Sequence, residues 1–486
     1  MGGKDRFPVT GDAAAIVSGL VARARAAQAA FDAATQEEVD EVVTAAGWAI
    51  VDPEHNRALA ELAVRDTGLG NVADKIAKNR RKTMGLLRDL VGAKSVGVIA
   101  EDESNGLVEI ARPVGVVGAL TPSTNPAATP ANNILNALKG RNAIIVAPSP
   151  KGVSTLSLLV TYIHAELDRL GLPRDLVQQL PAPVTREATK ELMRQVDLVV
   201  ATGSQTNVRA AYASGTPAIG VGAGNVAVIV DETADLADAA AKIARSKMFD
   251  NATSCSSENS VIAVAAVAEP LLAALAAAGG ALLERDEARA LERAMFADGR
   301  PAPDFVAQDA PAIVLRAALA RRELLDAGFL IVEETGVGAA HPFSGEKLSP
   351  VLTFYRAADF AAATALAQRL LRHQGAGHSV GLHTREERRA VELGLTLPVC
   401  RVIVNQAHCF ATGGSFDNAL PFSLSMGCGT WGRNSISNNL NYRHFLNITR
   451  VVRPLSPERV HEPTEEDLFG AYLRKTGRSP GRPPRS

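Results

Sequence analysis

The order of apolar and polar positions divides the first half of the chain into two textures. Residues 12–90 place apolar side chains three and four positions apart, which predicts amphipathic helices. The pattern then changes to short apolar runs separated by helical segments. Strands that alternate with helices predict right-handed crossovers and a buried parallel sheet. The expected strands cover residues 96–100, 107–111, 114–120, 142–148, 197–202 and 227–230, and the expected helices 154–170, 187–195 and 204–214.

The second half of the chain repeats this alternation with its own set of elements. Expected here are helices over 239–248 and 271–283 and strands over 260–264, 313–315 and 351–354. Together the halves predict an α/β protein with two doubly wound domains, the first Rossmann-like. The dinucleotide-binding domain should comprise residues 1–96 and 113–230, and the catalytic domain residues 231–425. After Pro454 the chain becomes polar and Pro/Arg-rich, which predicts a largely disordered tail over 454–486.

Composition and charge remove several classes of partner. The 51 basic and 52 acidic side chains give a net charge of −1, which provides no field to attract nucleic acid or an anionic membrane. No apolar run reaches the ~18–20 residues that a membrane span needs. The N-terminus shows no secretory apolar core, and Arg6 breaks the myristoylation pattern. The four cysteines lack CxxC spacing, which favours a metal-free protein of the reducing cytoplasm.

One cysteine stands out by its neighbours. Cys255 lies in a loop of small polar residues, Thr253-Ser-Cys-Ser-Ser, between the expected 239–248 helix and the strand that follows. A buried structural thiol is the common fate of an unpaired cysteine, but such thiols usually lie among aliphatic side chains. Small polar neighbours leave the sulfur accessible, and accessible, electropositive sites favour the thiolate. Cys255 is therefore a candidate nucleophile for an electrophilic carbon such as a carbonyl.

Three loops beside expected strands are candidates for ligand binding. Gly203 and Ser204 form a turn that opens a helix, where free N–H groups favour a phosphate, although most such turns are plain caps. A glycine-rich turn at 220–224 is a weaker signal of the same kind. Residues 121–126 should lie at the carboxyl edge of the sheet, where open α/β folds bind ligands. The spacing alone does not show that these loops meet Cys255.

Taken together, the motifs resemble the aldehyde dehydrogenase superfamily, and more closely its CoA-acylating branch. The resemblance spans residues 13–452. The motifs that carry it are Ser123-Thr-Asn-Pro, Ala201-Thr-Gly-Ser, Ala218-Ile-Gly-Val-Gly-Ala-Gly-Asn, Phe249-Asp-Asn with Cys255 and Glu258, Glu346-Lys-Leu-Ser-Pro, and Gly427-Cys-Gly-Thr-Trp-Gly. It implies the aldehyde dehydrogenase fold and oxidation of an aldehyde with a nicotinamide cofactor.

The resemblance implies a role for each matching residue. Cys255 would attack the aldehyde carbon, and Asn125 with the backbone N–H of Cys255 would hold the oxyanion, which is typically worth ~3–4 kcal/mol of barrier. The thiohemiacetal would give a hydride to the nicotinamide and leave an acyl thioester on the sulfur. Gly203 and Ser204 match the pyrophosphate turn, and Glu346 matches the acid that holds the nicotinamide ribose. The implied cofactor-binding set is Thr121, Ser123, Ser149, Lys151, Gly203, Ser204, Glu346 and Leu348.

One departure from the hydrolytic members bears on the reaction type. Those members carry a general-base Glu about 34 residues before the nucleophile, and that position is Val221 here. Valine cannot deprotonate water, and a general base usually contributes about 10²–10⁴-fold, so hydrolysis of the thioester should be slow. The expected second step is transfer of the acyl group to coenzyme A. Glu258 is an alternative base, but a place against the following helix or strand is the favoured interpretation.

The cofactor preference follows from the residues after the second strand of the sheet. The superfamily holds the adenosine 2′-OH of NAD with an acid at a position that Pro150 occupies here. Nothing there would repel a 2′-phosphate, and Ser149 and Lys151 could bind one. We therefore expect NADP or NAD as cofactor, with NADP accepted, and coenzyme A as co-substrate. A solvated helix start is the alternative interpretation of Lys151.

Substrate identity depends on residues 405–418 and a few charged positions. This loop resembles that of the acylating sulfoacetaldehyde dehydrogenases, and Arg433 stands where glycine is usual. A cation with amide donors suits an anionic head group on a short aldehyde. Sulfoacetaldehyde is the leading candidate, with acetaldehyde, propionaldehyde and succinate semialdehyde as alternatives. His378, His408 and Arg433 are candidates for binding substrate or CoA; a turn cap for His378 and a salt bridge for Arg433 are the alternatives.

Residues 444–452 alternate like a strand and, with residues 107–111, resemble the arm through which these enzymes pair. An unpaired edge of that length would be an aggregation hazard. We therefore expect a small β oligomerisation arm of residues 97–112 and 440–453 in a homodimer or homotetramer.

Three rival functions stay open at this point: a hydrolytic aldehyde dehydrogenase, an acyl-phosphate reductase, and a non-catalytic binding member of the fold. Val221 argues against hydrolysis. The joint presence of Cys255, Asn125 and Glu346 argues against a non-catalytic protein.

Overall fold

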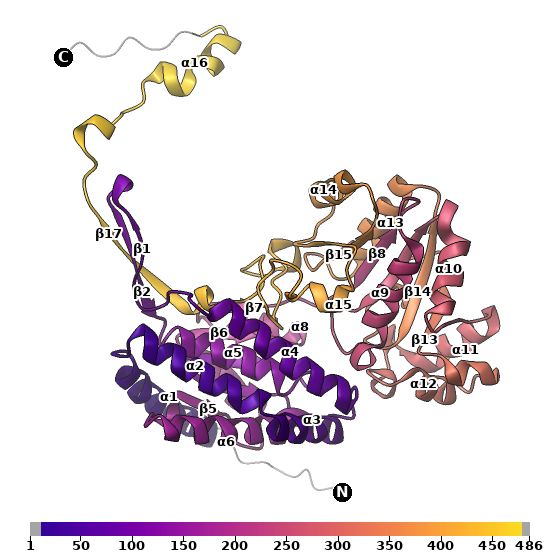
Figure 1. The fold of residues 1–486 in the computed structure, drawn as a ribbon, viewed down its shortest axis with the longest axis horizontal. Helices are drawn as coiled ribbons and strands as arrows, with labels where there is room; N and C mark the ends of the chain where they lie inside the picture. The colour runs from indigo at the N-terminus through magenta and orange to yellow at the C-terminus, as the bar shows by residue number, and fades with distance from the viewer. Residues whose placement is uncertain (1–10, 479–486) are drawn as a thin grey trace, which may run out of the picture. The chain divides into compact units, whose positions relative to one another are not determined.

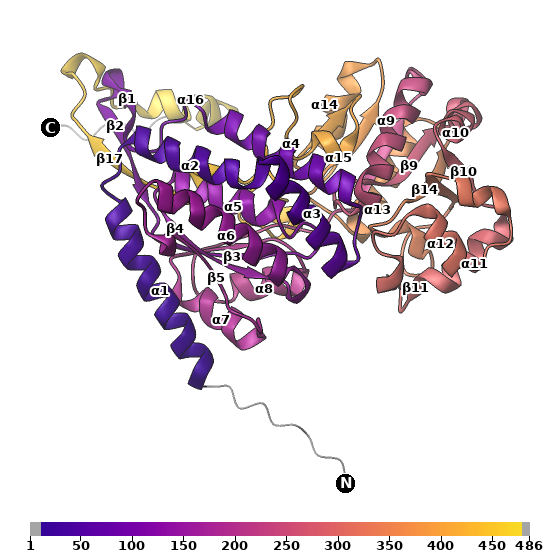
Figure 2. The same ribbon diagram turned by 60° about the horizontal axis from the view of Figure 1, so that its bottom comes forward.

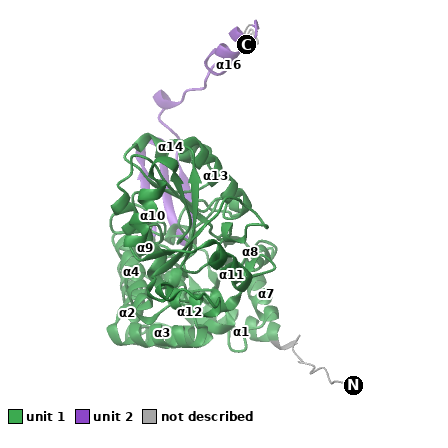
Figure 3. Ribbon diagram, turned by 90° about the vertical axis from the view of Figure 1, so that its right-hand side faces the viewer, with its two compact units in different colours: residues 1–95, 113–446 green, residues 96–112, 447–486 purple. Residues whose placement is uncertain are grey.

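The computed structural model describes residues 11–478 (Figure 1), and its contacts divide the chain into two compact units (Figure 3). Unit 1 comprises Met1–Ser95 and Pro113–Leu446, and unit 2 comprises Val96–Arg112 and Asn447–Ser486. The predictions for residues 1–10 and 479–486 lie outside the described residues. Within residues 11–478, no helix is long and apolar enough to cross a membrane.

Four helices precede the first sheet of unit 1, as the apolar spacing predicts. They are α1 (Gly11–Phe31), α2 (Gln36–Val51), α3 (Pro53–Thr67) and α4 (Val72–Leu90). Side chains fix their ends: Thr35 and Glu38 form a capping box at α2, and Asn71 accepts from the backbone of Asp74 at the start of α4. Helices α2 to α4 pack side by side over α5 (Ala128–Lys139) and α6 (Val153–Arg169) (Figure 2).

The first parallel sheet has the strand order β5-β4-β3-β6-β7. Its strands are β3 (Val116–Thr121), β4 (Ala143–Pro148), β5 (Val177–Gln179), β6 (Leu198–Ala201) and β7 (Ala218–Gly220). Helix α7 (Arg186–Gln195) precedes β6, and α8 (Gln205–Tyr212) connects β6 to β7. Strands β3 and β4 are buried along their whole length, as expected for a sheet covered on both faces. The order reverses between β3 and β6, and open α/β sheets bind ligands at such a reversal.

The second parallel sheet of unit 1 has the order β10-β13-β14-β9-β8-β15-β16. Its strands are β8 (Val226–Val230), β9 (Glu258–Val264), β10 (Gly280–Leu282), β13 (Phe329–Glu333), β14 (Val351–Ala357), β15 (Val380–His383) and β16 (Val402–Val404). Its helices are α9 (Leu236–Met248), α10 (Ala268–Ala277), α11 (Arg285–Met295), α12 (Ala310–Arg316), α13 (Phe360–His373), α14 (Glu387–Thr396) and α15 (His408–Ala411), with a small pair β11 (Phe296–Ala297) and β12 (Arg300–Pro301). One apolar core packs α9 and α10 on the sheet, and another packs α13 and α14 on it.

Three local features differ from the sequence patterns. Residues 313–315, predicted as a strand, belong to α12, because Asp309 accepts from the backbone of Ala312 and a proline occupies the first turn. The helix predicted over 271–283 stops earlier, because α10 ends at Ala277. Gly279, with φ of +98°, then turns the chain into β10. Helix α5 has no counterpart among the predictions, although Asn132, Asn133, Asn136 and Lys139 give it a polar stripe at helical spacing, and all its residues are buried in the fold.

Unit 2 is built on a three-stranded sheet of order β1-β2-β17. Its strands are β1 (Gly97–Asp102), β2 (Leu107–Pro113) and β17 (Leu446–Val452). Strands β1 and β17 are the two edges of this sheet, and most of their side chains are exposed. In a single chain these edges are unpaired. Beyond it, where composition predicts disorder, α16 (Glu465–Lys475) forms with Thr464 and Asp467 as a capping box.

Candidate active site

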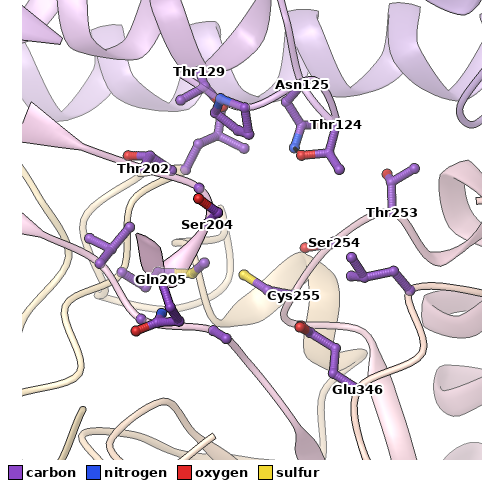
Figure 4. A pocket seen from close by; sticks show the side chains of 18 residues that line it. Thr124, Asn125, Thr129, Thr202, Ser204, Gln205, Thr253, Ser254, Cys255 and Glu346 are labelled. Atoms are coloured by element: carbon purple, nitrogen blue, oxygen red, sulfur yellow. Dashed lines mark hydrogen bonds between the residues drawn. The ribbon is translucent and has the colours of Figure 1, made fainter. Parts of the chain in front are cut away.

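A cavity of about 310 Å³ in unit 1 is lined by the sulfur-bearing Cys255 and by loops at the carboxyl ends of the first sheet (Figure 4). Of the predicted site residues, it is lined by Asn125, Gly203, Ser204, Cys255, Glu346 and Leu348. The other lining residues are Pro122, Thr124, Thr129, Thr202, Gln205, Val221, Gly222, Ala223, Thr253, Ser254, Leu424 and Met426. The structure thus brings the thiol, the amide and the glycine turn together, which spacing alone left open.

The reversal of strand order positions the first half of this cavity. Asn125 lies in the loop that follows β3, and Gly203 lies in the loop that follows the adjacent strand β6. Gly203 has φ of +143°, a conformation that favours glycine. Ser204 caps α8 by accepting from the backbone of Asn207. The start of α8 therefore faces the cavity, as suits a phosphate group.

The loop that carries Cys255 begins with an unusual backbone. Asp250, Asn251 and Ala252 are consecutive residues with φ of 50°, 51° and 56°. This left-handed conformation costs a residue with a Cβ roughly 1–2 kcal/mol. The loop packs closely on Gly70, where a Cβ would lie 1.9 Å from Oδ1 of Asp250. Only glycine permits this approach, so Gly70 allows the segment before α4 to pack directly against the thiol loop.

A buried ion cluster holds the loop in this conformation. The carboxylate of Asp250 accepts from Lys75 at 3.1 Å, from Lys78, and from Thr253 at 2.7 Å. The side chains of both lysines and of Asp250 are at most 5% exposed. Burial by itself raises the pKa of Asp250, but the charges of Lys78 and Lys75 hold that pKa below its usual value. Burial also lowers the pKa of Lys75 to about 8.

Lys78 connects this cluster to Asn125. Its Nζ lies 2.9 Å from Oδ1 of Asn125 and 3.0 Å from Oγ1 of Thr253. An ammonium group only donates hydrogen bonds, so the amide atom that faces it must be the oxygen. The amide nitrogen of Asn125 is thereby left as a donor, and its contact with Oγ1 of Thr124 is long at 3.5 Å. The sequence patterns did not single out Lys78 or Asp250, although Asp250 belongs to a motif of the resemblance.

The thiol of Cys255 is partly exposed and lies beside a histidine. Its Sγ is 3.5 Å from Nε2 of His378. Burial, and secondly the carboxylate of Glu346, raise the pKa of the Cys255 thiol to about 12. Burial lowers the pKa of His378 to about 3. At neutral pH a protonated thiol therefore faces a neutral imidazole. The thiol that the small neighbours predict to be accessible lines the cavity and is partly exposed, but the groups around it favour its protonated form.

His378 is held in place on two sides. Its Nδ1 lies 2.7 Å from Oγ of Ser379, and the guanidinium of Arg401 donates to its backbone carbonyl at 3.2 Å. His378 is 1% exposed and Arg401 6%. Arg401 also donates to the backbone of Gly427 and to the amide of Asn439. With Nδ1 donating to Oγ of Ser379, the neutral ring presents the lone pair of Nε2 to the thiol. Arg401 is a further residue that the sequence patterns did not single out.

Val221 lines the cavity and is 5% exposed. The structure therefore places an apolar side chain where the resemblance gives hydrolytic enzymes a general base. Glu346 is the only carboxylate among the described residues that line the cavity. Burial raises the pKa of Glu346 to about 8. Its Oε1 is buried without a hydrogen-bond partner in the described part of the chain, which fits an acceptor for a ligand hydroxyl.

Glu258 and His408 lie behind the thiol loop and not in the cavity lining. Oε1 of Glu258 accepts from the backbone N–H of His408 at 3.0 Å, and burial raises the pKa of Glu258 to about 7. Nδ1 of His408 lies 2.9 Å from the carbonyl of Ser256. Burial lowers the pKa of His408 to about 4, so its neutral ring donates from Nδ1 to that carbonyl. Both residues support the loop next to Cys255.

The remaining predicted residues surround the cavity. Thr121 ends β3, and its carbonyl accepts from the backbone N–H of Ser149 at 3.0 Å, so the loops after β3 and β4 lie side by side. Ser123 lies in the first of these loops, and the exposed Lys151 in the second. Arg433 lines a different cavity, of about 800 Å³, which shares Gln205, Gly222 and Ala223 with the thiol cavity.

Comparisons with known proteins agree with this geometry. Residues 8–288 match the aldehyde dehydrogenase family. The sulfoacetaldehyde dehydrogenase (acylating) of Cupriavidus necator is 62% identical over 466 residues, which cover 96% of this chain and 94% of that protein. An acetylating aldehyde dehydrogenase from Geobacillus thermoglucosidasius superposes with a TM-score of 0.88 at 35% identity, over 93% of this chain and 98% of the other. The propionaldehyde dehydrogenase of Rhodopseudomonas palustris, solved with bound CoA and an acylated cysteine, superposes with a TM-score of 0.80 at 25% identity, over 90% and 97%.

The chain belongs to the aldehyde dehydrogenase family, and its relatives place it in the acylating branch of that family. It is thus an oxidoreductase that acts on aldehydes. The α/β fold and the superfamily predicted from the motifs are confirmed.

Proposed function

We propose that this enzyme oxidises sulfoacetaldehyde and transfers the acyl group to coenzyme A, with NADP as hydride acceptor. The overall reaction converts aldehyde, CoA and NADP⁺ into acyl-CoA, NADPH and a proton. The observation that carries the choice of CoA over water is Val221, since it leaves no water-activating carboxylate at its place in the cavity. The proposed substrate is supported by the 62% identity to an acylating sulfoacetaldehyde dehydrogenase over nearly the whole chain.

The first step uses three side chains of the cavity. Sγ of Cys255 bonds to the aldehyde carbon while its proton passes to Nε2 of His378, which lies 3.5 Å away. The aldehyde oxygen gains negative charge, and the amide N–H of Asn125 and the backbone N–H of Cys255 stabilise it. One such donor is typically worth about 10²–10³-fold in rate. Because Lys78 holds the amide oxygen, Asn125 presents its donor without reorganisation.

The residues present fit a nicotinamide cofactor. The turn at Gly203 and Ser204 would hold its pyrophosphate, and the unpartnered Oε1 of Glu346 would accept from its ribose. Oγ of Ser149 is also buried without a partner among the described residues, and Lys151 is exposed two residues later, which suits the 2′-phosphate of NADP. When bound, the nicotinamide takes the hydride from the thiohemiacetal carbon, so that a thioester remains on Cys255.

The second step returns the enzyme to its starting state. The CoA sulfur bonds to the thioester carbon, the bond to Sγ of Cys255 breaks, and the proton of the CoA thiol replaces the one that Cys255 lost. His378 first releases to solvent the proton that it took in the first step, which is the proton of the overall reaction, and its neutral ring is then the base nearest to this exchange. Arg433 remains a candidate for contact with CoA, because its cavity adjoins that of the thiol.

Initial-rate assays with and without CoA test this function. We expect NADPH formation from sulfoacetaldehyde to fall at least about 100-fold when CoA is omitted, since no general base activates water. A panel of acetaldehyde, propionaldehyde and succinate semialdehyde, each with NADP or NAD, tests the substrate and the cofactor. Cys255→Ser serves as the inactive control. Free carboxylate formed at full rate without CoA would contradict the proposal.

We also propose a homodimer or homotetramer in the cytoplasm, and the exposed strands of unit 2 support its oligomeric part. Residues 97–112 and 440–453 form the proposed arm, and β1 and β17 leave most of their side chains exposed in the single chain. Light scattering on the purified protein would measure the mass of the assembly.

A further inference from the structure

A second cavity of unit 1, of about 380 Å³, collects positive charge. It is lined by Arg81 of α4, by Arg245 of α9 and by the loop that contains Gln406, Phe410 and Asp417. Arg81 has its guanidinium carbon 5.4 Å from the ring centre of Phe410, and Arg245 has its own 4.4 Å from the same ring. Two guanidinium groups thus flank one aromatic side chain, an arrangement that holds them in fixed orientations.

Both guanidinium groups interact electrostatically with Asp417, which offsets part of their charge. In the part of the chain that the structure describes, neither Arg81 nor Arg245 forms an ion pair. Nε of Arg81 is buried without a hydrogen-bond partner among those residues, and the nearest polar contact of this side chain is Oγ of Ser415 at 2.6 Å. Asp417 is the only carboxylate among the described lining residues, and it accepts from Ser415. The cavity therefore keeps an excess of positive charge and an unused buried donor.

A series of packed side chains, Phe410, Phe249 and Lys78, connects the lining of this cavity to the thiol site. The ring of Phe410 packs on the ring of Phe249, with centres 4.6 Å apart. On its other side, the ring of Phe249 lies 5.5 Å from Nζ of Lys78, which binds Asn125. Lys82, one turn after Lys78 on α4, is buried and donates to the carbonyl of Gly413. Basic side chains of α4 thus reach both the second cavity, through Arg81, and the oxyanion site, through Lys78.

We propose that this second cavity binds the sulfonate of the incoming aldehyde before the aldehyde reaches Cys255, and that Arg81 and Arg245 select for anionic substrates. The proposal rests on the function proposed above and names the residues that determine its substrate class. A sulfonate offers three acceptor oxygens, which suit the fork of donors on two guanidinium groups. A neutral aldehyde gains nothing from them. This assigns recognition of the head group to Arg81 and Arg245 in place of Arg433, which lines another cavity.

The test compares an anionic with a neutral aldehyde in matched variants. For Arg81→Gln and for Arg245→Gln, we expect kcat/KM for sulfoacetaldehyde to fall about 10- to 100-fold, as for a lost charge-assisted hydrogen bond. The kcat for sulfoacetaldehyde and both constants for propionaldehyde should change less than about twofold. Arg80→Gln, an exposed neighbour on α4, is the control and should behave as wild type. Arg245 is also exposed, so its variant should fold even where Arg81→Gln fails to.

Inhibition by ethanesulfonate, which has the sulfonate but no aldehyde, is an independent test of the site. Ethanesulfonate should inhibit oxidation of propionaldehyde by the wild-type enzyme and lose most of that inhibition in both variants. The proposal is overturned if neither variant changes kcat/KM for sulfoacetaldehyde, or if propionaldehyde loses as much. A wild-type enzyme that oxidises propionaldehyde but not sulfoacetaldehyde overturns the proposed substrate, and ethanesulfonate inhibition that the variants retain overturns the site.

Discussion

Helix α4 carries basic side chains in two different environments, one buried and paired with a carboxylate, the other at a cavity. Near its start, Lys75 and Lys78 are buried and share the carboxylate of Asp250. One turn further, Arg81 faces a cavity together with Arg245, and neither forms an ion pair among the described residues. A buried charge is tolerated only when it is paired, whereas a cation at an open cavity can wait for a ligand. The comparison separates charges that shape the active site from charges that are available to the substrate.

Removing the shared carboxylate should have the largest effect. Asp250→Ala leaves two buried lysines without their partner and releases a left-handed stretch of backbone. We expect the free energy of unfolding to fall by about 3–5 kcal/mol. Urea unfolding measures this change. Asp417→Ala, at the rim of the second cavity, is the matched control and should cost less than about 1 kcal/mol. Equal losses in the two variants would remove the distinction between the two regions.

Lys78→Met tests whether the first region acts through Asn125. We expect kcat to fall about 10²-fold for anionic and neutral aldehydes alike, with little change in KM, because the oxyanion donor loses its orientation. Lys75→Met is the control, since Lys75 shares Asp250 but donates to the carbonyl of Thr124 and not to Asn125. If Lys75→Met lowers kcat as much, the loss comes from the ion cluster and the orienting role of Lys78 is wrong.

The raised pKa of the Cys255 thiol predicts a characteristic pH dependence of alkylation. With the pKa of Cys255 raised to about 12, the thiolate fraction in the free enzyme should rise about tenfold per pH unit between pH 6 and 9. The rate of iodoacetamide modification at Cys255, followed by peptide mass spectrometry, should rise in parallel without a plateau. A plateau near pH 7 would mean that the resting thiol is already ionised, and that His378 is not needed to accept its proton.

The smallest expected effect concerns ionic strength. Charges at an open cavity are screened within about 10 Å at 0.1 M salt. We therefore expect kcat/KM for sulfoacetaldehyde to fall roughly two- to fivefold from low to high salt, and kcat/KM for propionaldehyde to stay constant. The double variant Arg81→Gln/Arg245→Gln should show no such dependence. A salt effect that persists in the double variant would place the steering charge elsewhere.

Helix α4 also shows which features of the structure the sequence predicts and which it does not. Its apolar spacing predicts the helix, but the spacing of its lysines is that of an ordinary solvated face. The carboxylate that pairs with Lys78 lies 172 residues later in the chain, so only the folded structure reveals the pair. In contrast, short sequence motifs are enough to identify four residues of the site, Gly203, Ser204, Cys255 and Glu346. The structure brings all four to one cavity.

Burial explains the other differences. The small neighbours of Cys255 indicate an accessible thiol, and the thiol does line the cavity, yet desolvation by the surrounding fold raises its pKa, which the local sequence does not show. Arg433 is prominent in the sequence because glycine is usual there, but its position in the fold puts it at another cavity. Which surface a side chain faces depends on contacts between elements, and no local pattern encodes those contacts.

The most direct test of the account is to stop the reaction at the enzyme-bound acyl group. Wild-type enzyme mixed with sulfoacetaldehyde and NADP, but no CoA, should form one equivalent of NADPH and a stable sulfoacetyl adduct on Cys255, detected by intact-mass and peptide mass spectrometry. Adding CoA should discharge the adduct as sulfoacetyl-CoA. Repeated turnover without CoA, or NADPH formation with no adduct on Cys255, would contradict the account.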